Sequence, residues 1–388
     1  MKVCGIISEY NPFHNGHRYQ IEQARKMGAT HIVAVMSGAV VQRGEAAVFD
    51  KHFRAKTACE NGADLVIELP CPYSIASAEL FAVGAVSVLK GLGVVDAISF
   101  GCETDDVKLM EKAVFATESL KNSDEVRKLI KGGESYPSAV FSVCKKRFGE
   151  DVAAMLSSPN NTLGIEYLRA AKRLGISLEP LLVKRKGASH DSGEISGNFA
   201  SASKIRELIL SGEAPSALVP YTLSEEVFNT ENMWKAAVFK LMSMSREELA
   251  AVPDCPDELA SRISLYLEKN LPKSLSELYD GVKTKNITHA RVRRVVLYSL
   301  LGIRKSDFSI SVYGRVLAAN RRGTEILAAS KGAASMPVSH SLSKLKRLGG
   351  DYGRLAELDV ISTGFQKLCA EKDVHFTPEF SVKFETQE

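Results

Sequence analysis

The sequence predicts an α/β protein whose first half forms a doubly wound, mainly parallel sheet. Short and almost continuously apolar runs alternate with helical patterns over the first two hundred residues. Parallel strands buried on both faces have this apolar character, and repeated βα units place helices on both sides of one sheet. The predicted strands lie at 3–10, 31–37, 64–70, 96–101 and 178–185, and the predicted helices at 16–27, 49–62, 77–91, 106–120, 137–148 and 161–174, with another starting near Ser203.

The pattern changes after a segment with two prolines at 213–220, which predicts a linker. Residues 223–302 show a helical pattern throughout, and the runs "SVYGRVLA" and "MPVSHSL" after them predict short strands mixed with helices. We therefore predict two regions, a parallel-sheet domain at 1–215 and a helical and mixed α/β region at 216–388.

Composition indicates a globular protein, because 45% of the 388 residues are hydrophobic and 25% are charged. No run approaches the roughly 20 apolar residues that cross a membrane, and "MKVCGIISEY" does not resemble a signal peptide, so we expect no membrane partner. The seven cysteines are scattered and form no CxxC pair. This predicts a reducing, cytoplasmic location and no thiolate metal site.

The charge is distributed unevenly along the chain. Residues 283–350 contain 14 Lys or Arg against two acids, a net charge of +12 in a chain whose total is +4. A regional imbalance of this size favours a polyanionic partner, and nucleic acid is the first candidate.

The segment "NPFHNGH" lies between the first predicted strand and the first predicted helix. His14 and His17 are three residues apart, so they share a face at the helix N-terminus, where free N–H groups favour an anion. Gly16 leaves room for a phosphate or base to approach. The alternative is a turn with two solvated histidines, but the position of the segment at the start of a βα series favours a phosphate site.

This segment resembles the HxGH signature of nucleotidyltransferases related to class I aminoacyl-tRNA synthetases. The resemblance implies a Rossmann-like domain at 1–215 that binds ATP or CTP and reacts at the α-phosphate. A second segment, "ISGNFASASKIRELI", is similar to the family's ISSTxIR element, in which Ser201, Ser203, Lys204 and Arg206 would hold the β- and γ-phosphates. The alternative here is an N-capped helix with a solvated basic face.

The resemblance extends to one family, the bacterial tRNA(Met) cytidine acetate ligases. It is carried by "EYNPFHNGH", "VMSGAVVQRGEAAVFDKHFRAKTACENGADLVIELP", "SFGCE", "SPNNTLGIEYLRA" and "THARVRRVVL". It implies an ATP-dependent ligase that activates acetate as acetyl-adenylate, releases pyrophosphate and acetylates the wobble cytidine of elongator tRNA(Met) to N4-acetylcytidine. Acetate is already ionised at neutral pH, so activation needs no general base, only positioning and charge neutralisation, with Mg²⁺ expected beside ATP.

The resemblance also assigns roles to single residues. Gly101, Asn160 and Arg185 would bind ATP, although an ordinary turn glycine, a helix N-cap and a solvated charge are the respective alternatives. The segment with Gln42, Arg43, Asp50, Lys51 and Arg54 is expected to be an active-site loop and helix near acetate or tRNA, and a solvated face is the alternative. The expected catalytic residues are His14, His17 and Lys204, and the expected ATP-binding residues are Ile7, Ser8, Glu9, Tyr10, Asn11, Pro12, Phe13, His14, Asn15, Gly16, His17, Arg18, Tyr19, Gln20, Gly101, Asn160, Arg185, Ser203 and Arg206.

The region 216–388 is expected to bind tRNA, chiefly through 283–305, which has seven basic residues and no acid. In a helix, His289 and Arg293 would lie along one side, flanked by Arg291 and Arg294, and would contact phosphates. A solvated basic helix is the alternative. For the whole chain, two rivals remain open, a small-molecule adenylyltransferase and a non-catalytic tRNA-binding protein.

Overall fold

A computed structural model describes residues 1–185, 195–309, 311–375, 377–382, 384 and 386. Within these residues the main sheet has seven strands in the order β7-β6-β1-β2-β5-β8-β9, and a separate pair, β3 and β4, forms a small hairpin. The strands are β1 (Val3–Ser8), β2 (His31–Ser37), β3 (Val40–Val41), β4 (Glu45–Ala46), β5 (Leu65–Leu69), β6 (Ala97–Cys102), β7 (Glu179–Lys184), β8 (Gly314–Ala319) and β9 (Val338–Ser339).

The five strands predicted for the first half all form, and their neighbours pair in parallel. Every residue of β2 and β5 is buried, Glu68 included, which explains why both strands are almost wholly apolar. The prediction placed the end of the first strand too late, at Tyr10. β1 ends at Ser8, and Tyr10 has a φ of 44°, which lies outside the extended region that a strand requires.

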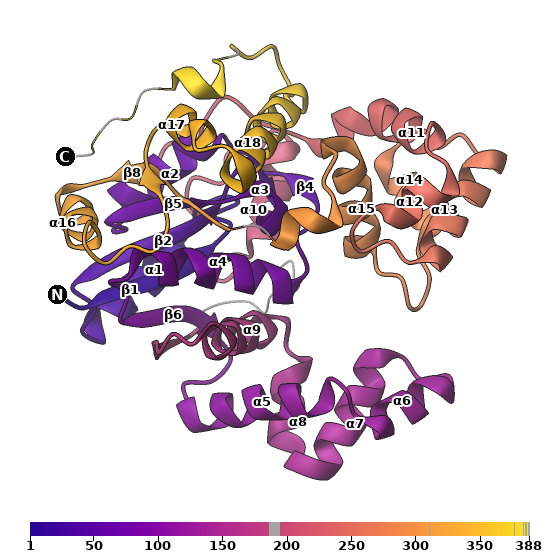
Figure 1. Cartoon of the computed structure of the whole chain (residues 1–388), viewed down its shortest axis with the longest axis horizontal. Helices are drawn as coiled ribbons and strands as arrows, with labels where there is room; N and C mark the ends of the chain where they lie inside the picture. Colours follow the sequence, from indigo (N-terminus) through magenta and orange to yellow (C-terminus); the bar gives the residue numbers. More distant parts are fainter. Residues whose placement is uncertain (186–194, 310, 376, 383, 385, 387–388) are drawn as a thin grey trace.

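The helices predicted for the first half also form, with ends that differ by a few residues. Three further helices of the described residues were not predicted, α3 (Cys71–Ser74), α6 (Asp124–Lys131) and α8 (Glu150–Ser157), and each is eight residues long or shorter. In Figure 1 the helices α5 to α8 form a lobe below the sheet. The helices are α1 (Asn15–Lys26), α2 (Lys51–Glu60), α3 (Cys71–Ser74), α4 (Ala78–Leu92), α5 (Val107–Leu120), α6 (Asp124–Lys131), α7 (Tyr136–Phe148), α8 (Glu150–Ser157), α9 (Pro159–Leu174) and α10 (Ala202–Leu210).

The second half begins with the predicted helical stretch, which forms a second lobe beside the sheet (Figure 1). Its apolar residues share one core that also includes Val40 and Ala46 of the β3–β4 hairpin. The elements are η1 (Thr230–Met233), α11 (Trp234–Met242), α12 (Arg246–Ala251), α13 (Asp257–Lys269), α14 (Leu275–Val282), α15 (His289–Leu301), η2 (Lys305–Ser309), α16 (Arg321–Ser330), α17 (Leu342–Arg347), α18 (Gly350–Leu368) and η3 (Glu379–Ser381).

The predicted short strands near the C-terminus correspond to β8 and β9, and both extend the main sheet. β8 pairs antiparallel with β5, and β9 pairs parallel with β8. The sheet therefore includes strands from both sides of residue 215. The core continues across residue 215, so this residue does not separate two packing units. The boundary there stays a prediction about which region binds ATP and which binds tRNA.

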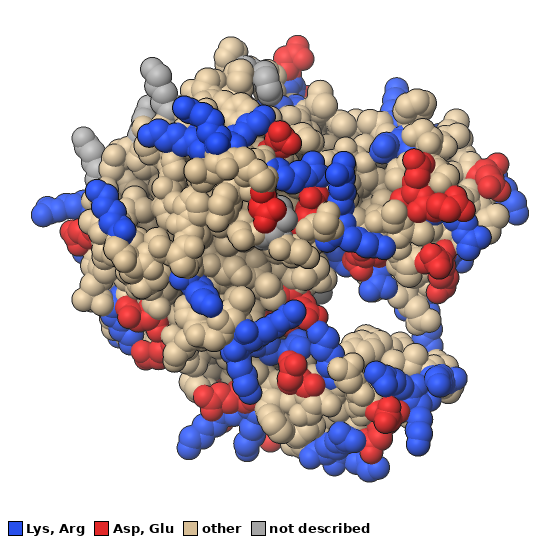
Figure 2. Space-filling view, viewed as in Figure 1, with Lys and Arg blue, Asp and Glu red and all other residues tan. Residues whose placement is uncertain are grey.

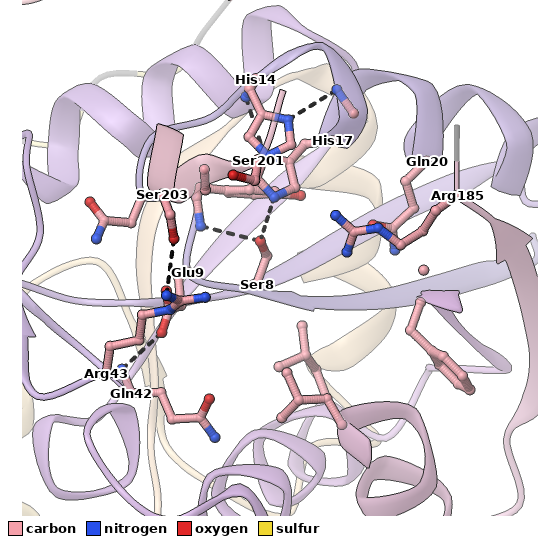
Figure 3. Close-up of a pocket in the computed structure, with 18 of the residues that line it drawn as sticks. Ser8, Glu9, His14, His17, Gln20, Gln42, Arg43, Arg185, Ser201 and Ser203 are labelled. Carbon is pink, nitrogen blue, oxygen red and sulfur yellow. Dashed lines mark hydrogen bonds between the residues drawn. The ribbon is translucent and has the colours of Figure 1, made fainter. Parts of the chain in front are cut away.

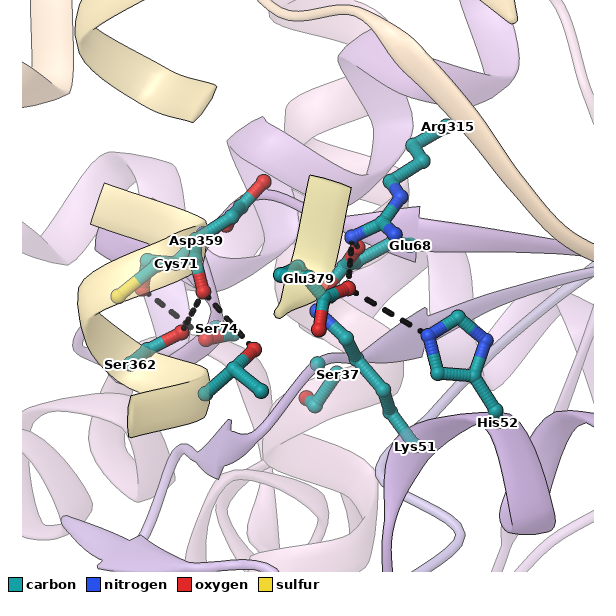
Figure 4. A network of polar contacts seen from close by, with 12 residues as sticks. Ser37, Lys51, His52, Glu68, Cys71, Ser74, Arg315, Asp359, Ser362 and Glu379 are labelled. Carbon is teal, nitrogen blue, oxygen red and sulfur yellow. Dashed lines mark hydrogen bonds and ion pairs between the residues drawn. The ribbon is translucent and has the colours of Figure 1, made fainter. Parts of the chain in front are cut away.

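A buried ionic network ties the two halves together (Figure 4). Nζ of Lys51 lies 2.7 Å from Oε1 of Glu68 and 2.9 Å from Oε1 of Glu379. The guanidinium of Arg315 contacts the same two carboxylates, and all four side chains are at most 3% exposed. Burial alone would lower the pKa of Lys51, but Glu379 and Glu68 raise it above its ordinary value, so the ammonium stays charged. Two cations and two anions thus balance within the network.

Within the described part of the chain, no helix is both long and apolar enough to cross a bilayer.

Candidate active site

A cavity of about 970 Å³ lies beyond the carboxyl ends of β1, β6 and β7 (Figure 3). This is the edge where ligands bind in doubly wound sheets. The described residues that line it are Ile7, Ser8, Glu9, Tyr10, Asn11, His14, Gly16, His17, Tyr19, Gln20, Gln42, Arg43, Ala78, Phe81, Phe100, Gly101, Thr162, Leu163, Gly164, Tyr167, Val183, Arg185, Phe199, Ala200, Ser201, Ala202, Ser203, Arg206, Thr288 and Ala290.

The two histidines of the HxGH segment begin α1 and cap it. Nδ1 of His14 accepts a hydrogen bond from Gly16 N–H at 3.0 Å, and Nδ1 of His17 accepts one from His14 N–H at 3.2 Å. When each ring is neutral, its proton must therefore lie on Nε2. The segment that predicted a phosphate site is also a reciprocal capping box, which fixes the tautomers of both rings.

The imidazoles are stacked, with ring centroids 3.8 Å apart and planes inclined by 27°. Burial, assisted by Arg185 and Arg206, lowers the pKa of His14 to about 3. Burial, His14 and Arg185 lower the pKa of His17 well below its ordinary value. Both rings are therefore neutral at pH 7 and offer Nε2–H as a donor.

Gly16 has a structural role beside the predicted one. A Cβ at this position would lie 2.8 Å from Cε1 of His14, closer than side chains tolerate. The glycine therefore allows the His14 ring to fold over the helix N-terminus. This contact adds to the close phosphate approach that the sequence suggested.

The "SASKIR" segment forms the opposite wall. Ser201 caps α10 by accepting from Lys204 N–H at 3.2 Å, and Ser203 Oγ accepts from the Arg43 guanidinium at 3.0 Å. Arg206 donates to the carbonyl oxygen of Asn11 at 2.8 Å, which joins this wall to the HxGH segment. The structure thus brings together two segments almost two hundred residues apart.

Lys204, the third expected catalytic residue, does not line the cavity. Its Nζ pairs with Oε1 of Glu207 at 2.8 Å, one turn along α10. Its neighbours Ser203 and Arg206 do line the cavity. The catalytic role of Lys204 stays a prediction that this geometry does not favour.

At the other end of the cavity, Gly101 near the end of β6 and Arg185 directly after β7 lie side by side. A Cβ at Gly101 would meet Cγ of Arg185 at 3.5 Å, an ordinary contact, so protein packing does not require the glycine. Burial lowers the pKa of Arg185, while Glu103 acts in the opposite direction. Asn160 lies in the first turn of α9, but its side chain is outside the described part of the structure.

Four other residues expected to bind ATP do not line the cavity: Pro12, Phe13, Asn15 and Arg18. Phe13 is fully buried behind it. Nδ2 of Asn15 instead donates to the carbonyl oxygens of Asn198 and Ala217, and Arg18 pairs with Glu22 in solvent. Asn15 and Arg18 lie in α1, where successive side chains point in different directions, and Pro12 and Phe13 precede this helix.

The residues of the segment from Gln42 to Arg54 have different places in the structure. Gln42 and Arg43 line the cavity. A solvated face is excluded for Lys51 and Arg54, which are at most 1% exposed. The Arg54 guanidinium donates to the carbonyl oxygens of Glu9 and Ser37, among others, so it fixes the loop after β1.

Sequence reasoning missed several lining residues. Thr162, Leu163 and Gly164 come from α9, beside the predicted Asn160, and Phe100 and Val183 sit just before predicted residues. Their positions near the ends of predicted strands and helices could have identified them. No sequence pattern identifies Thr288 and Ala290 as lining residues, since only the tertiary fold brings the N-terminus of α15 to this cavity.

The expected tRNA-binding side chains of α15 are paired with acids from other segments. Arg291 and Arg294 both contact Asp254, with Nε of Arg291 at 3.1 Å from Oδ1. His289 lies 3.2 Å from Asp280. These acids lie outside 283–305, so the local charge of that segment overstated the free positive charge. Figure 2 nevertheless shows Lys and Arg gathered over α17 and around α15, and a hollow between the two helical lobes.

A family model of HIGH nucleotidyl transferases matches residues 1–377. The tRNA(Met) cytidine acetate ligase of Acetivibrio thermocellus is 34% identical over 397 residues, covering 95% of each chain. That of Clostridium kluyveri is 34% identical over 409 residues, covering 98% of each. Among solved structures, Thermotoga maritima TmcAL superposes over 100% of both chains, with a TM-score of 0.88 and 29% identity for the apo form. The form bound with alpha-thio ATP has a TM-score of 0.86 and 27% identity.

Proposed function

The chain belongs to the tRNA(Met) cytidine acetate ligase family of HIGH nucleotidyl transferases, and we propose how its cavity performs that reaction. In this proposal the protein uses ATP to activate acetate as acetyl-adenylate, and then acetylates the wobble cytidine of elongator tRNA(Met) to N4-acetylcytidine. One observation carries the proposal: two stacked, neutral imidazoles at a helix N-terminus face a serine-capped helix across one cavity.

In the first step the acetate carboxylate attacks the α-phosphorus of ATP, and pyrophosphate leaves. Nε2–H of His14 and His17 donates to the phosphate oxygens as negative charge develops there. Ser201, Ser203 and Arg206 hold the β- and γ-phosphates, and Gly101 and Arg185 receive the adenosine end. Arg43, on the β3–β4 hairpin beside Ser203, adds a cation that the sequence did not assign to phosphate.

Mg²⁺ is expected with ATP, where it neutralises the phosphates. Within the described residues, no group of three or more His, Cys, Asp or Glu side chains could hold a metal ion. Phosphate oxygens and water must then supply most ligands of the ion, as is usual for Mg²⁺ at nucleotide sites. A cytoplasmic location, where ATP and tRNA are available, stays a prediction.

The central test is incubation of the protein with ATP, Mg²⁺, radiolabelled acetate and total tRNA. We expect label in elongator tRNA(Met), and ATP–pyrophosphate exchange that depends on acetate. A small-molecule adenylyltransferase predicts exchange that requires a mononucleotide or a similar acceptor instead. A non-catalytic tRNA-binding protein predicts no exchange and no label, so either outcome would remove the proposal.

The proposed contact between α15 and tRNA phosphates predicts a salt-dependent effect. The Arg291 side chain is 39% exposed, so it can leave Asp254 for a phosphate. Arg291→Ala is expected to weaken tRNA binding at low salt and to reduce the slope of log K against log salt by about 1. Filter binding of tRNA(Met) at several salt concentrations measures both.

The matched control is Lys26→Ala, which removes an exposed cation at the end of α1 far from its capped N-terminus. It should leave affinity and slope at the values of the unmodified protein. Equal slopes for Arg291→Ala and Lys26→Ala would show that Arg291 makes no phosphate contact.

A further inference from the structure

We propose that Glu9 is the general base of the second step, the group that removes a proton from cytidine N4 during acetyl transfer. The inference rests on the proposed function. A cytosine amine is a weak nucleophile because its lone pair is delocalised into the ring, so a positioned acceptor for its proton is valuable. General-base catalysis of this kind contributes about 10²–10⁴-fold.

Glu9 is placed where such a base is needed. It follows β1 directly after Ser8, and both residues line the cavity together with His17 and Ser203 (Figure 3). Oε1 of Glu9 accepts from the Gln42 N–H at 2.9 Å. The Glu9 carbonyl oxygen accepts from Arg54 at 2.6 Å. The residue is thus fixed both at its backbone and at one carboxylate oxygen.

The other lining groups are poorly suited to the task. Glu9 is the one carboxylate among the described residues that line the cavity. The imidazoles of His14 and His17 use their Nδ1 lone pairs to accept backbone N–H groups, so each presents an N–H to the cavity. Arg43, Arg185 and Arg206 are cations. Among the described lining residues, Glu9 is therefore the group best suited to accept a proton.

The surroundings of Glu9 adjust its basicity. Burial raises the pKa of its carboxyl, and Glu45 acts in the same direction, while Arg206 and Arg43 oppose them. The net pKa is raised. A carboxylate with a raised pKa holds a proton more strongly than an exposed one, which favours proton removal during the reaction.

The step balances without a further reactant. The N4 lone pair forms a bond to the acetyl carbonyl carbon, and the carbonyl π electrons move to oxygen. Glu9 takes one N4 proton, and the second stays in the amide product. The oxygen electrons then return and the bond from carbon to the adenylate oxygen breaks, so AMP leaves with that electron pair. Glu9 releases its proton to water when the products depart.

The test separates the two half-reactions in Glu9→Gln. The new amide oxygen can still accept from Gln42 N–H, but the side chain cannot take a proton. ATP–pyrophosphate exchange with acetate reports the first step, and single-turnover transfer of labelled acetate to tRNA(Met) reports the second. The rate of transfer should fall by about 10²–10⁴-fold. The fold-loss of exchange should be at least ten times smaller than the fold-loss of transfer.

A pH profile distinguishes a base from a residue that only shapes the site. In the unmodified protein, the transfer rate should rise with pH until Glu9 is ionised and then level off. In Glu9→Gln the rise should disappear, and Glu9→Asp should recover part of the rate with the rise retained. The control Glu22→Gln changes an exposed carboxylate of α1 and should alter neither step.

Each remaining outcome overturns the inference. Equal loss of exchange and transfer in Glu9→Gln would show that Glu9 acts in nucleotide binding or in folding. A pH rise that persists in Glu9→Gln would assign the proton transfer to another group. Failure of the unmodified protein to exchange pyrophosphate with acetate, or to label tRNA, would remove the proposed function itself and with it this role.

Discussion

Replacing His17 with asparagine is expected to reduce acetate-dependent ATP–pyrophosphate exchange by about 10²–10³-fold, the usual cost of one donor to developing charge. The imidazole has two separate roles, because Nδ1 accepts the His14 N–H and Nε2 lies 3.5 Å from Oγ of Ser8, which also lines the cavity. Asparagine Oδ1 can take over the cap, but the residue has no atom in the place of Nε2. Activity should therefore be lost while the start of α1 stays intact.

His17→Ala completes the comparison, since it also removes the cap. It should lose similar activity and about 1 kcal/mol of stability as well. His340→Ala, which removes an exposed histidine elsewhere, is the control and should exchange normally. Thermal unfolding and exchange assays on the three variants measure both roles. Full exchange activity in His17→Asn would contradict the proposed role of Nε2–H.

Lys51→Met is expected to lower the free energy of unfolding by about 3–5 kcal/mol, the cost of removing one partner from a buried ion pair. Lys51 is fully buried, and its Nζ contacts both Glu68 and Glu379. Without the ammonium, the two buried carboxylates share Arg315, and Glu379 also keeps its contact with His52 at 3.4 Å. Urea unfolding followed by circular dichroism measures the change.

Two further variants make this prediction specific. Lys56→Met is the control. Lys56 lies on the same helix, its side chain is 57% exposed, and its Nζ lies 3.9 Å from Oε1 of Glu60. It should change stability by less than about 0.5 kcal/mol. Lys51→Met combined with Glu379→Gln restores the balance of charge and should recover part of the loss. Two results together would show that the network is not tightly coupled. Lys51→Met would be as stable as Lys56→Met, and adding Glu379→Gln would recover no stability.

The sequence was sufficient for the parallel sheet and for the centre of the site, because both depend on local patterns. Almost continuously apolar runs identified the buried strands, and the two histidines and "SASKIR" marked the N-termini of helices that the fold brings to one cavity. The family resemblance then predicted the substrates, and the comparisons show the family itself.

Features that depend on long-range partners could not be predicted. Arg291 and Arg294 look like free cations in the sequence, but Asp254 pairs with both across the lobe. Lys51 and Arg315 likewise count as surface charges until the fold buries them. The direction of β8 was also hidden, because an apolar run indicates a strand without showing which neighbour it joins.

The position of β8 and Glu379 has a consequence for synthesis on the ribosome. Lys51 and Glu68 emerge early, whereas Arg315 and Glu379, which complete their network, are translated some 250 to 330 residues later. Thr288 and Ala290 of the cavity wall also come late. The nascent first half therefore holds the Lys51–Glu68 pair without its two later partners, and a sheet without its last strands. Folding of this chain is expected to wait for translation to finish, and a nucleotide domain cut at residue 215 would not be a stable unit.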